Sequence, residues 1–175
     1  AFFTKIYDTT IRFFGSLIIC AIAFIPFVFS FLIKNEFQDS YYQVPILLIG
    51  SMFNILVSFM GSIYVAKKAT KEIAKTSIFA AIINIIINLI LIKKIGLYAA
   101  SISTLIAYMT MFVYRAIDSR KYVKLSIKSS LILNMLIMLG IACTSYYMKN
   151  TYVSIAVLLV VAIDAIITNK KTIKF

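Results

Sequence analysis

Six long apolar stretches occupy most of this chain, and they decide what it can fold into. They lie at about residues 13–33, 44–66, 77–92, 95–114, 131–148 and 152–168. A helix needs roughly 20 apolar residues to cross a bilayer. The chain is 62% hydrophobic and only 14% charged, so a soluble fold would lack the polar residues to cover its surface. The sequence therefore predicts an all-α, polytopic membrane helix bundle with six transmembrane helices in a single region.

The net charge of +12 has a one-sided distribution along the predicted topology. All but four of the 18 basic residues fall in segments on the side that holds both chain ends. The four exceptions are Lys34, Lys93, Lys94 and Lys149. An excess of Lys and Arg in short loops marks the cytoplasmic side of a membrane. The N- and C-termini of this chain are thus predicted to be cytoplasmic. The membrane topology explains the excess of basic residues, so no nucleic-acid partner is needed to account for it.

The lead-in at residues 1–12 does not begin with Met and lacks the layout of a signal peptide. The tail at 169–175 is basic and polar, as expected after a last span. We expect this chain to be the C-terminal part of a longer polypeptide, whose N-terminal helices are missing here.

The residues available for chemistry argue against an enzyme. Histidine is absent, which excludes the common acid–base dyads and most zinc sites. Cys20 and Cys143 lie in separate spans without metal-ligand spacing, and packing is the better interpretation of both. Because glycine-rich phosphate loops and nucleophile elbows are also missing, we expect no catalytic residue, metal or cofactor.

Polar stripes run along the second, third and fourth predicted spans. Their members recur at three- and four-residue steps: Ser51, Asn54, Ser58 and Ser62; Ser77, Ala81, Asn84 and Asn88; Ser101, Thr104 and Tyr108. Such side chains join helices through hydrogen bonds, or they line a cavity that a polar substrate crosses. Amides at mid-depth on adjacent helices favour the cavity, so Asn54, Asn84 and Asn88 are the candidate substrate residues.

Asp164 is the acidic residue inside a predicted span. An intramembrane carboxylate usually has a function, such as proton coupling. Asp164 lies close to the basic tail, however, and water or Lys170 is within its reach on the sequence. We favour this second interpretation while keeping Asp164 among the candidate residues.

The third and fourth spans form a helical hairpin around a very tight turn at residues 93–96. Gly96 provides the backbone freedom that this turn requires. The residues that follow are small, so another helix backbone can approach closely. This close-packing set includes Ala99, Ala100, Ser101, Ser103 and Thr104.

The same run resembles the O-antigen and capsular polysaccharide flippases of the multidrug/oligosaccharidyl-lipid/polysaccharide exporter superfamily. Their pattern is an Asn-rich helix end followed by Gly-x-x-Gly-Ala-Ala-x-Ala-Thr. Gly96, Ala100 and Thr104 match it, whereas Ala99 replaces the second glycine and two serines replace alanines. The acidic-aromatic segment 35–40 and the Pro45 that follows it are similar to the external loop of this family.

The resemblance implies a full protein of 12 to 14 helices in two lobes around a central cavity, with this chain supplying the last six. The implied activity is the flipping of an undecaprenyl-pyrophosphate-linked oligosaccharide across the bacterial cytoplasmic membrane for polysaccharide biosynthesis. Arg115, near the inner mouth, is the cationic residue of this chain that could face the pyrophosphate. The alternatives are a cation-coupled multidrug exporter, a peptidoglycan-precursor flippase and a non-transporting membrane scaffold.

Overall fold

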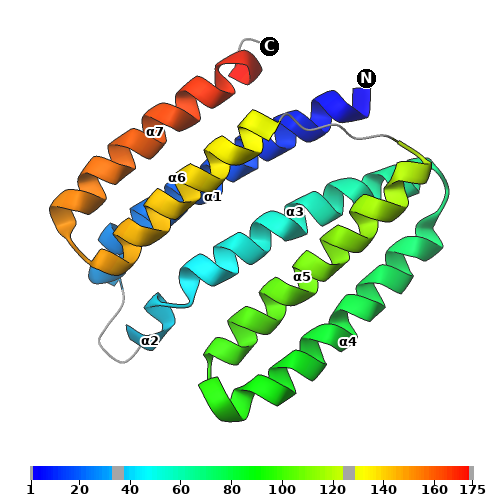
Figure 1. The fold of residues 1–175 in the computed structure, drawn as a ribbon, viewed down its shortest axis with the longest axis horizontal. Coiled ribbons are helices and arrows are strands. Elements are labelled where there is room, and N and C mark those ends of the chain that lie inside the picture. The colour runs from blue at the N-terminus through cyan, green and yellow to red at the C-terminus, as the bar shows by residue number, and fades with distance from the viewer. Residues whose placement is uncertain (1, 33–37, 124–128, 174–175) are drawn as a thin grey trace. The chain divides into compact units, whose positions relative to one another are not determined.

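The computed structural model describes residues 2–32, 38–123 and 129–173, and the elements in these ranges are all helical. The long helices in Figure 1 are α1 (Phe2–Leu32), α3 (Val44–Ala66), α4 (Thr70–Ile95), α5 (Tyr98–Asp118), α6 (Ser129–Met148) and α7 (Thr151–Ile173). The short helix α2 (Gln38–Tyr41) precedes α3, and a 3-10 turn, η2 (Ser119–Lys121), follows α5. Within these described ranges, six helices are long and apolar enough to cross a membrane. The predicted all-α bundle of a multi-pass membrane protein is thereby confirmed.

Two helices begin earlier than the apolar runs suggest. α1 starts at Phe2 rather than near residue 13, because its polar lead-in is also helical. The Arg12 guanidinium pairs with the Asp8 carboxylate one turn away at 2.9 Å, an arrangement that supports a helix. α4 likewise starts at Thr70, and Lys75 pairs with Glu72 within its first two turns.

Some predicted segments lie outside the described residues. They are residues 34–37 of the external loop, Lys124 and Lys128 of the loop before α6, and Lys174 of the tail.

The chain forms two compact units. The first unit is Ala1–Pro45 together with Ser126–Phe175, and the second is Ile46–Leu125. In the first unit α1 packs against both α6 and α7, which also contact each other. Its buried apolar side chains include Ile18, Ile19, Ile22, Met135, Ala142 and Val161.

Four tyrosines of the first unit join α2 to the end of α6. They are Tyr41, Tyr42, Tyr146 and Tyr147. The rings of Tyr42 and Tyr147 are parallel, with centroids 6.2 Å apart, and the Lys149 ammonium lies 4.6 Å from the Tyr42 ring centroid. Such amphipathic rings at the ends of apolar helices are typical of a membrane–water boundary.

The second unit is built on an antiparallel hairpin of α4 and α5, drawn in green and yellow-green in Figure 1. Gly96 makes the turn with φ 55° and ψ −132°, a conformation that an L side chain rarely adopts. Its N–H donates to the Ile92 carbonyl at 3.0 Å and so caps α4. α3 comes close to α5 at Gly50, where a Cβ would lie 3.6 Å from the Leu105 Cα. The core of this unit contains Val57, Ala80, Ala107 and Met111, flanked by Tyr108 and Phe112.

Candidate functional site

The last turn of α5 carries a buried arginine. Arg115 lies near the end of a candidate membrane-spanning helix and is only 3% exposed. Charged side chains inside predicted spans are expensive, and those that occur usually contact protein groups and mark a functional position. The surroundings of Arg115 therefore define the candidate site of the second unit.

The Arg115 guanidinium donates hydrogen bonds to four oxygen atoms on two neighbouring helices. From α4 it is held by the Thr76 hydroxyl at 2.9 Å, the Ile73 carbonyl at 3.2 Å and the Ser77 hydroxyl at 3.2 Å. From α3 it is held by the Val57 carbonyl at 3.0 Å. Arg115 thus ties α5 to both other helices of its unit.

Gly61 makes room for this arrangement on α3. A Cβ at position 61 would lie 3.3 Å from the Arg115 Nη1 atom, tighter than ordinary van der Waals contact. Because Gly61 follows Val57 by one helical turn, the missing side chain leaves the Val57 carbonyl open to the guanidinium.

Within the described part of the chain, Arg115 has no carboxylate partner. The three ion pairs found there are Arg12 with Asp8, Lys75 with Glu72, and Lys121 with Asp118. The charge on Arg115 is stabilised by carbonyl and hydroxyl dipoles alone. The site consequently holds a buried positive charge without a carboxylate in direct contact among the described residues.

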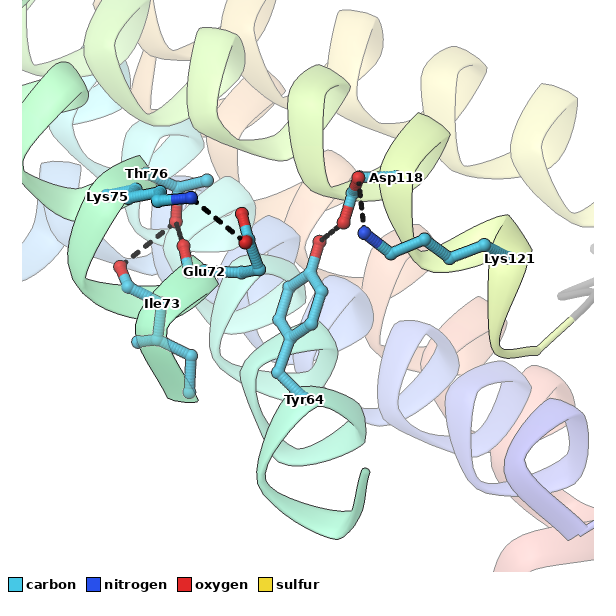
Figure 2. Close-up of polar contacts among 7 residues, drawn as sticks. All are labelled: Tyr64, Glu72, Ile73, Lys75, Thr76, Asp118 and Lys121. Carbon is cyan, nitrogen blue, oxygen red and sulfur yellow. Dashed lines mark hydrogen bonds and ion pairs between the residues drawn. The ribbon is translucent and has the colours of Figure 1, made fainter. Parts of the chain in front are cut away.

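A second polar network lies one turn further along α5, at Asp118 (Figure 2). The Tyr64 hydroxyl of α3 donates to the Asp118 carboxylate at 2.8 Å, and the Lys121 ammonium contacts the same carboxylate at 2.9 Å. Figure 2 also shows the Thr76 hydroxyl bonded within α4, where it donates to the carbonyls of Glu72 and Ile73. Since that hydroxyl is fixed as a donor to its own helix, its oxygen lone pair is free to accept from Arg115.

A hollow of about 280 Å³ opens between α4 and α5 next to Thr76. Its lining is formed by Lys75, Thr76, Phe79, Met111 and Tyr114. None of the asparagines that the sequence singles out lies in this lining.

The predicted amides on α4 have different environments. The Asn84 carbonyl oxygen accepts from the Ser103 hydroxyl at 3.1 Å, and its amide nitrogen donates to Thr104 at 3.4 Å. Asn84 therefore joins α4 to α5. The side-chain oxygen of Asn88 is buried and has no hydrogen-bond partner in the described structure. Asn88 is thus the amide of this stripe that retains an unused acceptor.

The serines of the predicted polar stripe on α3 form hydrogen bonds within their own helix. The hydroxyls of Ser51, Ser58 and Ser62 donate to carbonyls three or four residues earlier in the same helix. For Asn54, which is half-buried, the described residues supply no side-chain hydrogen bond. Serines that bond their own helix give no sign of a cavity, because they need neither water nor a substrate.

The small-residue face after Gly96 includes most, but not all, of its predicted members. Ala99 is fully buried, and Ser101 and Ser103 are also buried. Ala100 is exposed, because consecutive helical residues point in different directions.

Asp164 belongs to the first unit and is not paired with Lys170 among the described residues. Both of its carboxylate oxygens instead accept from the Asn134 amide of α6, at 3.1 and 3.2 Å. The structure brings together an acid and an amide that the sequence places in two separate spans. Of the two partners expected for Asp164, water and Lys170, the second makes no bond to it among the described residues.

Thr76 and Ser77 are partners of Arg115 that sequence reasoning did not single out as a set. A signal was present, because Arg115 follows Gly96 by as many residues as Ser77 precedes it. An antiparallel hairpin around that glycine brings such equidistant residues side by side. Gly61 carried no comparable signal.

Comparisons with family models, curated proteins and solved structures gave no match for this chain.

Proposed function

We propose that this chain is part of a membrane transporter that flips an undecaprenyl-pyrophosphate-linked oligosaccharide across the bacterial cytoplasmic membrane. The family resemblance of the hairpin around Gly96 supports this assignment. The observation that carries it furthest is the buried Arg115 without a carboxylate partner among the described residues. A pyrophosphate is strongly anionic, and a fixed cation inside the membrane-spanning region would lower the energy of its passage.

Arg115 would act mainly through its electric field. Four of its five N–H groups already donate to protein oxygens, so the guanidinium is held in place before any substrate arrives. Asn88 and Asn54 are the candidates for contact with sugar hydroxyls, because their side chains have unused hydrogen-bonding capacity among the described residues. Helices beyond this chain, which the resemblance implies, would complete the passage.

The test is complementation in a bacterial strain that lacks its own flippase. Full-length protein is expected to restore surface polysaccharide and to remove the accumulated lipid-linked intermediate. Arg115→Gln is expected to abolish restoration, and Arg115→Lys to retain part of it, because lysine keeps the charge. Arg120→Gln is the matched control, since Arg120 is exposed and near the same helix end. Normal membrane levels without any restoration by the unaltered protein would overturn the assignment.

A cation-coupled exporter of the same superfamily is the second candidate, and Asp164 is the observation that favours it. A carboxylate inside a span, contacted by one amide, is the kind of group that marks a cation pathway. Drug efflux driven by a proton gradient, and lost in Asp164→Asn, would favour this candidate. Rescue of peptidoglycan synthesis would point to the precursor flippase, and inactivity in all three assays to the scaffold.

A further inference from the structure

The hollow between α4 and α5 is polar at one end and apolar at the other. Phe79 follows Lys75 by four residues on α4, and Met111 precedes Tyr114 by three residues on α5. Residues at these spacings lie on one face of a helix, one turn apart. Because the two helices are antiparallel, Phe79 and Met111 both lie one turn further from the helix ends than Lys75 and Tyr114. The lining thus changes from a cation and a phenol to two apolar side chains.

The depth of the hollow suits the boundary of a membrane. Lys75 is about 8 Å along α4 from its first residue, and Tyr114 is about 6 Å from the last residue of α5. At this depth Lys and Tyr direct their polar tips toward water while their carbon atoms stay in the apolar layer. Both side chains are exposed enough to do so: the Lys75 side chain is 70% exposed and Tyr114 is 45% exposed.

The charge around the hollow is strongly positive. Residues 66–76 and 114–122, at the same end of the α4–α5 hairpin, contain seven basic and two acidic side chains. Both acidic residues are already engaged, Glu72 with Lys75 and Asp118 with Tyr64 and Lys121. The pair of Lys75 with Glu72 is exposed, so it is weak and leaves ammonium protons for another acceptor. Arg115 lies directly behind Thr76 and adds a buried positive charge.

We propose that this hollow binds one phospholipid with a net negative head group, from the leaflet at the basic end of α4 and α5. The Lys75 ammonium and the Tyr114 hydroxyl contact the head-group phosphate, and an acyl chain lies along Phe79 and Met111. Basic pockets between membrane helices bind anionic lipids in this manner, with about 1 kcal/mol for each Lys or Arg near the surface. This binding does not depend on the transport activity proposed above.

The test measures which lipid stays with the full-length protein. Purified protein is placed in lipid nanodiscs that contain equal amounts of phosphatidylglycerol and phosphatidylcholine, and bound lipid is counted by native mass spectrometry after mild detergent extraction. We expect retention of one phosphatidylglycerol. Lys75→Gln is expected to weaken that retention about fivefold, and Tyr114→Phe to weaken it by a smaller factor.

Two lysine variants serve as matched controls. Lys71→Gln removes a charge at the same end outside the lining, and Lys94→Gln removes one at the opposite end of the hairpin. Both are expected to retain the lipid within about twofold of the unaltered protein. Because all these lysines are exposed, each variant is expected to fold.

A second measurement separates a lipid from a free phosphate. Anionic lipid is expected to raise the thermal midpoint of the detergent-purified protein, and inorganic phosphate at the same concentration is not. Stabilisation by inorganic phosphate alone would overturn the proposal. Equal retention of the two lipids, or unchanged retention in Lys75→Gln, would overturn it as well.

Discussion

Tyr41 and Tyr146 exchange hydrogen bonds. The Tyr41 hydroxyl donates to the Tyr146 backbone carbonyl at 3.0 Å, and the Tyr146 hydroxyl donates to the Tyr41 carbonyl at 2.7 Å. Their rings stack with centroids 4.2 Å apart, and both residues are buried. Each tyrosine therefore satisfies a backbone group of the other, and the pair fixes α2 to the end of α6.

Removing either hydroxyl of this pair is expected to destabilise the first unit. Tyr41→Phe and Tyr146→Phe should each cost about 1 kcal/mol, because a buried carbonyl loses its donor while the ring stays in place. The double variant should cost less than the sum, since both bonds depend on the same alignment of the rings. Circular dichroism of thermal unfolding in detergent measures these effects in a chain without tryptophan. Tyr152→Phe, at a tyrosine that is 86% exposed, is the control, and strict additivity would contradict the cooperative pair.

Tyr41 should also make the stability of the first unit depend on pH in the alkaline range. Burial, followed by the neighbouring Tyr42 and Tyr147, raises the pKa of Tyr41 above its ordinary value of 10.0. Because the folded state holds the neutral phenol, this contribution is complete below about pH 10 and is lost as pH rises through the folded pKa. The stability measured by thermal unfolding in detergent should therefore decline as pH rises over this range. The Tyr41→Phe variant should show a smaller decline. An identical decline in that variant would show that other groups cause it.

Alanine substitutions at Gly96 and Gly140 distinguish the effect of backbone strain on stability from the effect of crowding by an added side chain. A Cβ at either position would meet nothing within 4 Å, but only Gly96 has a positive φ. Gly96→Ala is expected to destabilise by about 1–3 kcal/mol, because alanine is strained in this conformation. Gly140→Ala, within helix α6, is expected to be neutral or to stabilise by up to about 1 kcal/mol. Equal effects of the two substitutions on thermal unfolding would contradict the role assigned to the Gly96 turn.

Arg115 and Gly61 should be coupled energetically. Arg115→Met is expected to cost about 3 kcal/mol, because it removes charge-assisted bonds and leaves the hydroxyls of Thr76 and Ser77 without their donor. Gly61→Ala should destabilise the unaltered chain or leave it unchanged, since the added Cβ crowds the guanidinium. In the Arg115→Met background the same change should stabilise by up to about 1 kcal/mol through helix propensity. A Gly61→Ala effect that is the same in both backgrounds would rule out the coupling.

Asn84 and Asn88 should respond in opposite directions to replacement by leucine. Asn84→Leu is expected to lower the free energy of unfolding by about 0.6 kcal/mol, a typical contribution of one hydrogen bond between membrane helices. Asn88→Leu is expected to gain stability of about 1 kcal/mol, because a buried acceptor without a partner is removed.

The proposed transport role adds a second readout for the two asparagines. If Asn88 contacts the substrate, the more stable Asn88→Leu variant will export less polysaccharide than Asn84→Leu at equal membrane levels. Export that simply follows stability in both variants would assign the two amides to packing.

The helical architecture was predictable because each apolar run is long enough to specify a span by itself. The early starts of α1 and α4 were not, because ion pairs such as Asp8–Arg12 extend a helix into sequence that reads as a polar lead-in. The division into two units was also not predictable. Apolar residues that face lipid and those that face another helix are chemically alike, so the sequence does not tell them apart. In the structure, 6% of the most apolar part of α4 is buried inside the protein, against 39% for α1.

The candidate site was predictable only in part. Asp164 was recognisable as a charge in an apolar run and Arg115 as a charge at the end of one, but their partners depend on which helices become neighbours. The polar stripes were ambiguous for a physical reason: a serine such as Ser58 can satisfy its hydroxyl on its own helix, so its spacing does not reveal whether it meets water, a substrate or another helix.

The oxygens that hold Arg115 are carbonyls and hydroxyls, and such groups do not gain protons when the surroundings become acidic. An arginine held by carboxylates would be released as those carboxylates were neutralised. The bonds by which Arg115 joins α5 to α3 and α4 therefore survive acidification. Acidification of the membrane face at this end would thus leave the three helices joined through Arg115.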